Sequence, residues 1–200
     1  MPKRVDHQQR RREIAEALYR IAATRGLAAV TLRAVAAEAG ISMNLVQYYF
    51  PAKEDMLRFA WERMAELSAE RATGGIVAAL GTGDERAVVR AYLAGVLPSD
   101  ERSRTLCAVQ IAYFAVDVTR GSRQPDQEAL LPHLVRGLAD QIRLAQGKNG
   151  VPADLDAERE ADTLATMAAG LVSGILVGAY TDEQAAALVD YRLDRLFGAS

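Results

Sequence analysis

Cysteine, histidine and aromatic residues are scarce in this 200-residue chain. Cys107 is the only cysteine, so no disulfide can form within the chain, which fits a reducing, cytoplasmic setting. Aromatic residues make up 6% of the chain and alanine is abundant, and this bias favours helices over strands. Residues 1–25 are highly charged and contain no apolar stretch of signal-peptide length, so we expect no export signal. The apolar half and charged quarter exclude a disordered chain or a disulfide scaffold.

Motifs for catalysis, metal binding and cofactor binding are also absent. The two histidines, His7 and His133, are far apart in the sequence, and there is no HExxH, no CxxC, no nucleophile elbow and no phosphate-binding glycine loop. The chain is therefore predicted not to be an enzyme and to have no catalytic residue, metal or cofactor. Cys107 lies in an apolar run and is interpreted as a small core residue.

The net charge of −2 conceals an uneven distribution along the chain. Residues 1–60 contain ten Lys or Arg against six Asp or Glu, whereas residues 61–200 contain fourteen against twenty. The first sixty residues are therefore the part of the chain suited to face a polyanion.

Apolar residues recur at helical spacing through the whole chain, which predicts an all-α fold of about nine helices. Glycines between residues 74 and 83 are expected to interrupt the helical pattern, with a short helical turn at 76–80. The pattern predicts an N-terminal three-helix domain (1–52) and a C-terminal helical domain (53–200) connected by helix 53–71. The predicted helices are 8–25, 31–39, 43–49, 53–71, 84–97, 102–119, 126–146, 156–179 and 182–197.

The segment Thr163–Thr181 contains no charged residue and is about as long as a membrane span. It is rich in small residues and lacks the basic or aromatic anchors of a transmembrane helix. We interpret it as a helix buried on all sides, in which Gly170, Gly174 and Gly178 let another helix approach closely.

Two short predicted helices, 31–39 and 43–49, are joined by a tight turn at Gly40. This is the layout of a helix-turn-helix, although an ordinary helical corner has the same pattern. A basic arm precedes the pair, and the second helix carries hydrogen-bonding residues rather than acidic ones on its outward side. These features favour DNA binding, because phosphate repels an acidic face.

The runs Thr31–Ser42 (TLRAVAAEAGIS) and Val46–Glu54 (VQYYFPAKE) resemble the DNA-binding domain of the tetracycline-repressor (TetR) family. The resemblance covers about residues 10–58, and beyond residue 60 only the family's general plan applies. It implies a homodimeric regulator of nine helices, with an N-terminal helix-turn-helix domain. Its C-terminal domain would bind a small molecule and dimerise. The chain would then be a repressor that binds a palindromic operator in double-stranded DNA and is released by an unidentified ligand.

The resemblance assigns DNA contacts residue by residue. Thr31 and Lys53 fall at phosphate-contacting positions, and Met43 and Asn44 open the helix that would read bases. Gln47 stands where many relatives have a tyrosine. Tyr48 is interpreted as a packing residue, and Arg10, Arg11 and Arg12 stay open between a solvated helix start and phosphate contacts. The predicted DNA-binding set is Thr31, Arg33, Ser42, Met43, Asn44, Leu45, Gln47, Tyr49 and Lys53.

Two further sets of residues are predicted in the C-terminal part. Aromatic side chains with a few polar groups form a candidate ligand pocket, although each alone is better explained as core: Trp61, Met64, Tyr92, Gln110, Tyr113 and Asp117. The last two helices are predicted to pair in a dimer through Gly170, Gly174, Gly178, Leu188 and Leu196. The alternative function is a helical ligand-binding or protein-interaction module without operator binding. No membrane partner is expected.

Overall fold

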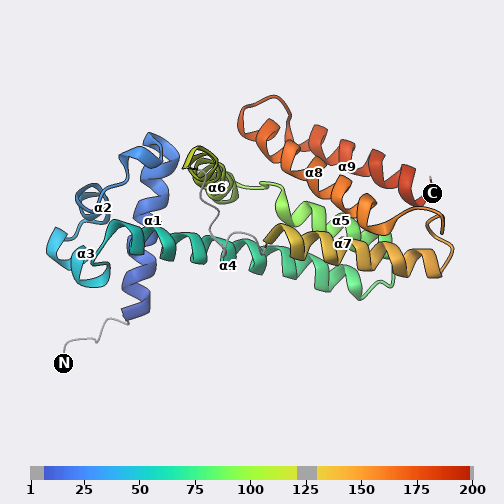
Figure 1. The fold of residues 1–200 in the computed structure, drawn as a ribbon, viewed down its shortest axis with the longest axis horizontal. Coiled ribbons are helices and arrows are strands. Elements are labelled where there is room, and N and C mark those ends of the chain that lie inside the picture. The colour runs from blue at the N-terminus through green and yellow to red at the C-terminus, as the bar shows by residue number, and fades with distance from the viewer. Residues whose placement is uncertain (1–6, 121–129, 199–200) are drawn as a thin grey trace. The chain divides into compact units, whose positions relative to one another are not determined.

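The computed structural model describes residues 7–120 and 130–198, which are helical throughout with no strand among them (Figure 1). The predicted all-α fold is confirmed. The helices in chain order are α1 (His7–Arg25), the 3-10 helix η1 (Leu27–Ala29), α2 (Leu32–Ala39), α3 (Met43–Tyr49), α4 (Lys53–Leu80), α5 (Glu85–Val96), α6 (Glu101–Arg120), α7 (Leu130–Gly147), α8 (Ala157–Leu176) and α9 (Asp182–Phe197).

Helix α4 is longer than predicted and contradicts the expected break at Gly74 and Gly75. It continues through both glycines to Leu80, so it has 28 residues and a length of about 42 Å. A glycine inside a helix costs only about 1 kcal/mol, which the neighbouring helical turns can offset. The helix ends where Gly83 adopts a left-handed conformation (φ 69°) and Asp84 caps α5.

The chain divides into two compact units, and the first contains residues 1–67 and 104–122. Its core brings together buried side chains from α1, α2, α3 and α4, with Leu106 and Val109 of α6. The Tyr19 hydroxyl donates a hydrogen bond of 2.5 Å to the Ala60 carbonyl and so fastens α1 to α4. Unit 1 is thus larger than the predicted 1–52 domain, because α6 and the start of α4 complete its core.

The second compact unit contains residues 68–103 and 123–200. Its core is formed by apolar faces of α5, α7, α8 and α9. Two arginines of α5 pair with two aspartates of α9: Arg90 with Asp190 at 2.6 Å, and Arg86 with Asp194 at 2.5 Å. The hydrogen bond from Arg90 holds the pKa of Asp190 below its ordinary value. These contacts fix α9 against α5.

One expectation about burial is wrong. Helix α8 is not buried on all sides, because Thr163, Thr166, Gly170 and Ser173 line an exposed face without a charged residue. Cys107 of α6 is buried as predicted, whereas Phe114 of the same helix is 67% exposed. Periodicity cannot distinguish a fully buried helix from one whose second apolar face stays open in the single chain.

None of the helices in the described part of the chain combines the length and apolar content that a membrane crossing requires.

A close helix contact inside unit 2 gives a stability prediction. A Cβ added at Gly137 of α7 would lie 2.8 Å from ring atoms of Tyr92, whereas a Cβ at Gly75 of α4 would meet nothing within 4 Å. Gly137→Ala is therefore expected to lower the free energy of unfolding by about 1–3 kcal/mol. Gly75→Ala, the matched control, is expected to raise it by up to about 1 kcal/mol. Urea unfolding measures both, and an unchanged midpoint for Gly137→Ala would contradict the close contact.

Candidate nucleic-acid interface

The turn between α2 and α3 is built from local signals in the sequence. Thr31 caps α2, its hydroxyl oxygen accepting a hydrogen bond of 3.0 Å from the Ala34 amide. Gly40 ends α2 in a left-handed conformation (φ 66°), which a residue with a Cβ rarely adopts. Ser42 then caps α3 by accepting from the Leu45 amide at 3.2 Å. Three residues, Gly40–Ser42, therefore join the two helices, which is the turn length of a helix-turn-helix.

Buried residues hold α3 against unit 1 and leave its other face open. Val46 and Phe50 are fully buried in the unit 1 core. Met43, Asn44 and Gln47 are exposed on the opposite side, while Leu45 is half-buried. The structure thus presents the predicted base-reading residues on one accessible helix face.

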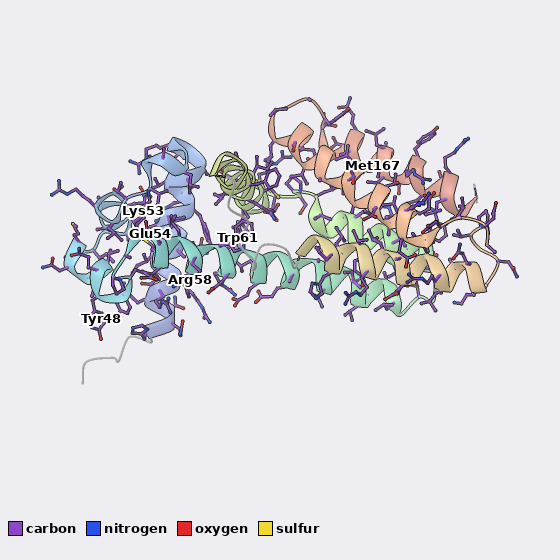
Figure 2. All side chains as sticks on the ribbon, in the orientation of Figure 1. Tyr48, Lys53, Glu54, Arg58, Trp61 and Met167 are labelled. Atoms are coloured by element: carbon purple, nitrogen blue, oxygen red, sulfur yellow. The ribbon has the colours of Figure 1, made fainter. Side chains whose placement is uncertain are left out.

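The charges near this face suit a polyanion. Helix α3 carries no charged residue, and Glu38 of α2 is paired with Arg20 and Arg25 of α1. Arg33 and Lys53 make no ion pair or hydrogen bond with another described residue, so both cations can bind phosphate. Lys53 begins α4, and Tyr48 projects outward from α3 (Figure 2). Tyr48 is 70% exposed, so it is not a buried packing residue.

The first turns of α1 contact the end of α3, which the sequence analysis missed. The His7 ring lies 4.7 Å from that of Tyr49, centroid to centroid, and Tyr49 lies 5.1 Å from Tyr48. The Arg11 guanidinium lies over the rings of Phe50 and Phe59, at 4.8 and 4.2 Å. The available signal was the four-residue spacing of His7 and Arg11, which places them on one helix face.

The predicted ligand residues are divided between the two units. Trp61 and Met64 belong to unit 1, where Met64 is buried and Trp61 packs against the core that also contains Leu106 and Val109. Gln110, on the same helix as Leu106, is half-buried. Tyr92 belongs to unit 2, where it lies against Gly137. The side chains of Tyr113 and Asp117 lie outside the described residues.

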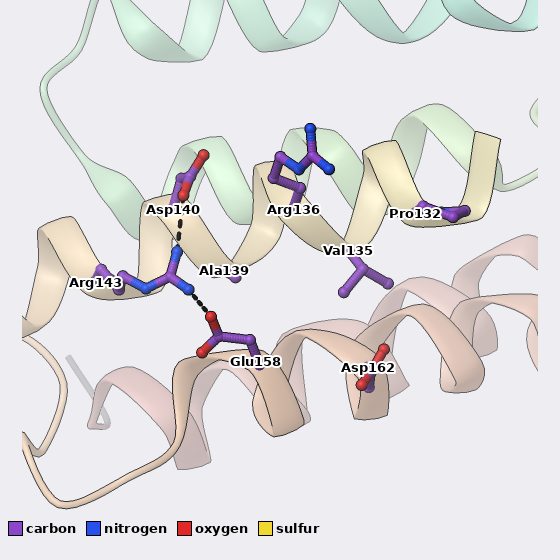
Figure 3. A pocket seen from close by; sticks show the side chains of 8 residues that line it. All are labelled: Pro132, Val135, Arg136, Ala139, Asp140, Arg143, Glu158 and Asp162. Atoms are coloured by element: carbon purple, nitrogen blue, oxygen red, sulfur yellow. Dashed lines mark hydrogen bonds and ion pairs between the residues drawn. The ribbon is translucent and has the colours of Figure 1, made fainter. Parts of the chain in front are cut away.

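A groove between α7 and α8 lies within unit 2 and contains none of the predicted ligand residues (Figure 3). Its volume is about 640 Å³. Arg143 bridges its edge by pairing with Asp140 at 2.8 Å and with Glu158. The lining residues are Pro132, Val135, Arg136, Ala139, Asp140, Arg143, Glu158 and Asp162.

The predicted dimer residues have different surroundings. Gly170 is exposed, and an added Cβ there would meet nothing within 4 Å. Gly174 lies beneath the ring of Tyr180 of the same chain, and Gly178 has a left-handed conformation (φ 74°) just after α8. Leu188 is 39% exposed, whereas Leu196 is buried in the unit 2 core. Gly170, Gly178 and Leu188 are thus exposed in the single chain, whereas Leu196 is not.

Two family comparisons cover most of the chain. Residues 14–59 match "Bacterial regulatory proteins, tetR family", and residues 85–198 match "BetI-type transcriptional repressor, C-terminal". The HTH-type transcriptional regulator PksA of Bacillus subtilis (strain 168) is 38% identical over 71 residues. That segment is 36% of this chain and 35% of PksA, so the chain matches about a third of this relative.

Solved structures match nearly the whole fold. A transcriptional regulator from Rhodococcus sp. Rha1 has a TM-score of 0.78 and 24% identity over 93% of this chain and 95% of its own. A regulator from Saccharomonospora viridis in complex with choline has a TM-score of 0.75 and 26% identity over 94% of this chain and 95% of its own. From the match over residues 85–198, the helix-turn-helix match and these folds, the chain belongs to the tetR family of bacterial transcriptional regulators, with a C-terminal region of the BetI repressor type.

Proposed function

We propose that this protein is a repressor that binds a palindromic operator as a homodimer and is released by a small molecule. DNA binding is supported by the accessible face of α3. This face is uncharged, contains the polar residues Asn44 and Gln47, and is bordered by the unpaired cations Arg33 and Lys53. Uncharged polar side chains can read base edges, while the cations bind phosphates. Because it acts on chromosomal DNA, the protein would work in the cytoplasm.

The exposed face of α8 and α9 supports a homodimer. On α8 this face consists of small uncharged residues, and on α9 it includes Leu188 and Tyr191, which is 63% exposed. Exposed apolar area on two adjacent helices of a water-soluble unit is typical of an interface. Pairing these helices across a two-fold axis would form a four-helix interface and hold two copies of α3 on one operator.

Choline is the first ligand to test, because the S. viridis regulator was crystallised with it. A quaternary ammonium ion binds over aromatic faces, and Trp61 is the only tryptophan in the chain. Trp61 packs on the core that joins α4 to α6 in unit 1, so a ligand there would act on the helices that support α3. The proposal retains Trp61, Met64, Tyr92, Gln110, Tyr113 and Asp117 as the candidate ligand residues.

The test measures binding to DNA from upstream of the protein's own gene, with and without choline, while following Trp61 fluorescence. We expect choline to quench the fluorescence and to weaken operator binding, and a thousandfold release corresponds to about 4 kcal/mol of preference for the released state. 3,3-Dimethylbutanol, an uncharged analogue of choline, is the matched control. Undiminished DNA binding with saturated quenching would contradict induction, and binding of choline without any DNA binding would favour the alternative ligand-binding module.

A further inference from the structure

We propose that His7 and Arg11 form a second contact with the DNA backbone beside α3, and that protonation of His7 tightens this contact. The inference rests on the proposed DNA-binding function and adds α1 to the interface. It would make operator affinity depend on pH near neutrality.

The geometry places both side chains at the end of the recognition helix. His7 and Arg11 are four residues apart on α1 and therefore lie on one face, one turn from each other. His7 lies against Tyr49 at 4.7 Å and near Tyr48 at 6.3 Å, centroid to centroid. By the family resemblance, Tyr49 occupies a position that contacts the DNA backbone. A side chain in ring contact with Tyr49 is thus within reach of the same phosphates.

Arg11 is held by aromatic rings rather than by a carboxylate. Its guanidinium lies over Phe50 and Phe59, and its Nε is buried without a hydrogen-bond partner. No described carboxylate forms an ion pair with Arg11. The cation is therefore kept in one orientation with its charge unneutralised, which lowers the entropy lost when a phosphate binds.

The described groups that face His7 are aromatic or cationic. Helix α3 contributes only the phenols of Tyr48 and Tyr49 and no charge. On α1, Arg10 is paired with Glu13 at 2.6 Å, so Arg11 is the unneutralised neighbour one turn away, and like charges at this spacing repel. Asp6, which precedes His7 in the sequence, is the adjacent carboxylate. A phosphate bound beside His7 and Arg11 would pair with both cations, and this favours the protonated imidazole on DNA.

The direction of the pH dependence follows from the coupling between DNA binding and protonation of His7. Because the phosphate contact favours the protonated imidazole, DNA binding takes up a proton and tightens as pH falls. An unperturbed histidine titrates near pH 6.5, and a rise of one pKa unit on binding corresponds to about a tenfold gain in affinity. The extra phosphate contact also steepens the salt dependence by about one unit.

The experiment uses the full-length protein and a mixed-sequence duplex of roughly three helical turns, because a backbone contact does not require the operator sequence. Affinity is measured by fluorescence anisotropy at several salt concentrations near pH 6 and pH 8. We expect the wild type to bind up to tenfold more tightly near pH 6. His7→Gln should bind equally at both pH values with the weaker affinity, and His7→Arg equally with the tighter one.

Three further variants complete the test. His133→Gln removes the only other histidine, which lies on α7, and should retain the wild-type pH dependence. Asp6→Asn should also retain the wild-type pH dependence. This result would show that the pH dependence comes from the DNA phosphate and not from the neighbouring carboxylate. Arg11→Gln should lower the salt slope at both pH values, with circular dichroism as the check on folding.

Two outcomes would overturn the inference: a wild type whose DNA affinity does not change with pH, or His7→Gln with an unaltered pH dependence. Either leaves operator binding through α3 intact. A wild type that binds neither this duplex nor its upstream DNA overturns the proposed function and this inference together.

Discussion

Asn44→Ala is expected to weaken binding to the cognate operator by about 1–3 kcal/mol and to leave binding to random DNA unchanged. Asn44 is exposed in the first turn of α3, where a recognition helix contacts base edges. Its amide can both donate to and accept from an adenine, so its loss removes discrimination rather than charge. Competition binding with operator and scrambled duplexes measures the difference. Equal losses on both duplexes would exclude Asn44 from base recognition.

Lys53→Ala is the matched contrast, because this residue supplies charge without base contacts. It should weaken binding to operator and random DNA alike and reduce the salt slope by about one unit. Lys53 is the first residue of α4 and is unpaired among the described residues, so its loss should leave folding unchanged.

Leu188→Glu is expected to convert the proposed dimer to monomers and to abolish tight operator binding. Two-fold symmetry would place the new carboxylate twice in the interface, and burying an unpaired charge costs several kcal/mol for each copy. Monomers would present one α3, whereas palindromic half-sites require two copies about 34 Å apart. Sedimentation velocity measures whether the variant is a monomer or a dimer. Fluorescence anisotropy measures its affinity for the operator.

Leu144→Glu is the control for this substitution. Leu144 of α7 is 53% exposed and Leu188 is 39% exposed, so both variants place a carboxylate on the surface of unit 2. Leu144→Glu should stay dimeric and bind the operator. Gly174 is unsuitable for this test because a larger side chain would strike Tyr180 of its own chain. A dimeric Leu188→Glu variant would place the interface elsewhere.

The sequence by itself identified the local features of the DNA-binding end. Thr31 and Ser42 are residue types that favour helix N-caps, and they cap α2 and α3. Gly40 ends α2 in the left-handed conformation that glycine adopts without strain. These features depend on residues within four positions of each other, which is why a single sequence is sufficient. The polar face of α3 could be predicted for the same reason, since helical periodicity sets it.

Only the tertiary structure decided which distant segments share a core and which faces stay open. Gly74 and Gly75 are local signals for a break, yet α4 continues through them, and the helical turns on either side can offset a cost of about 1 kcal/mol per glycine. Leu106 joins the unit 1 core across about forty residues of intervening chain. His7 contacts Tyr49 for the same reason, since packing between helices depends on side chains that meet only after the chain has folded.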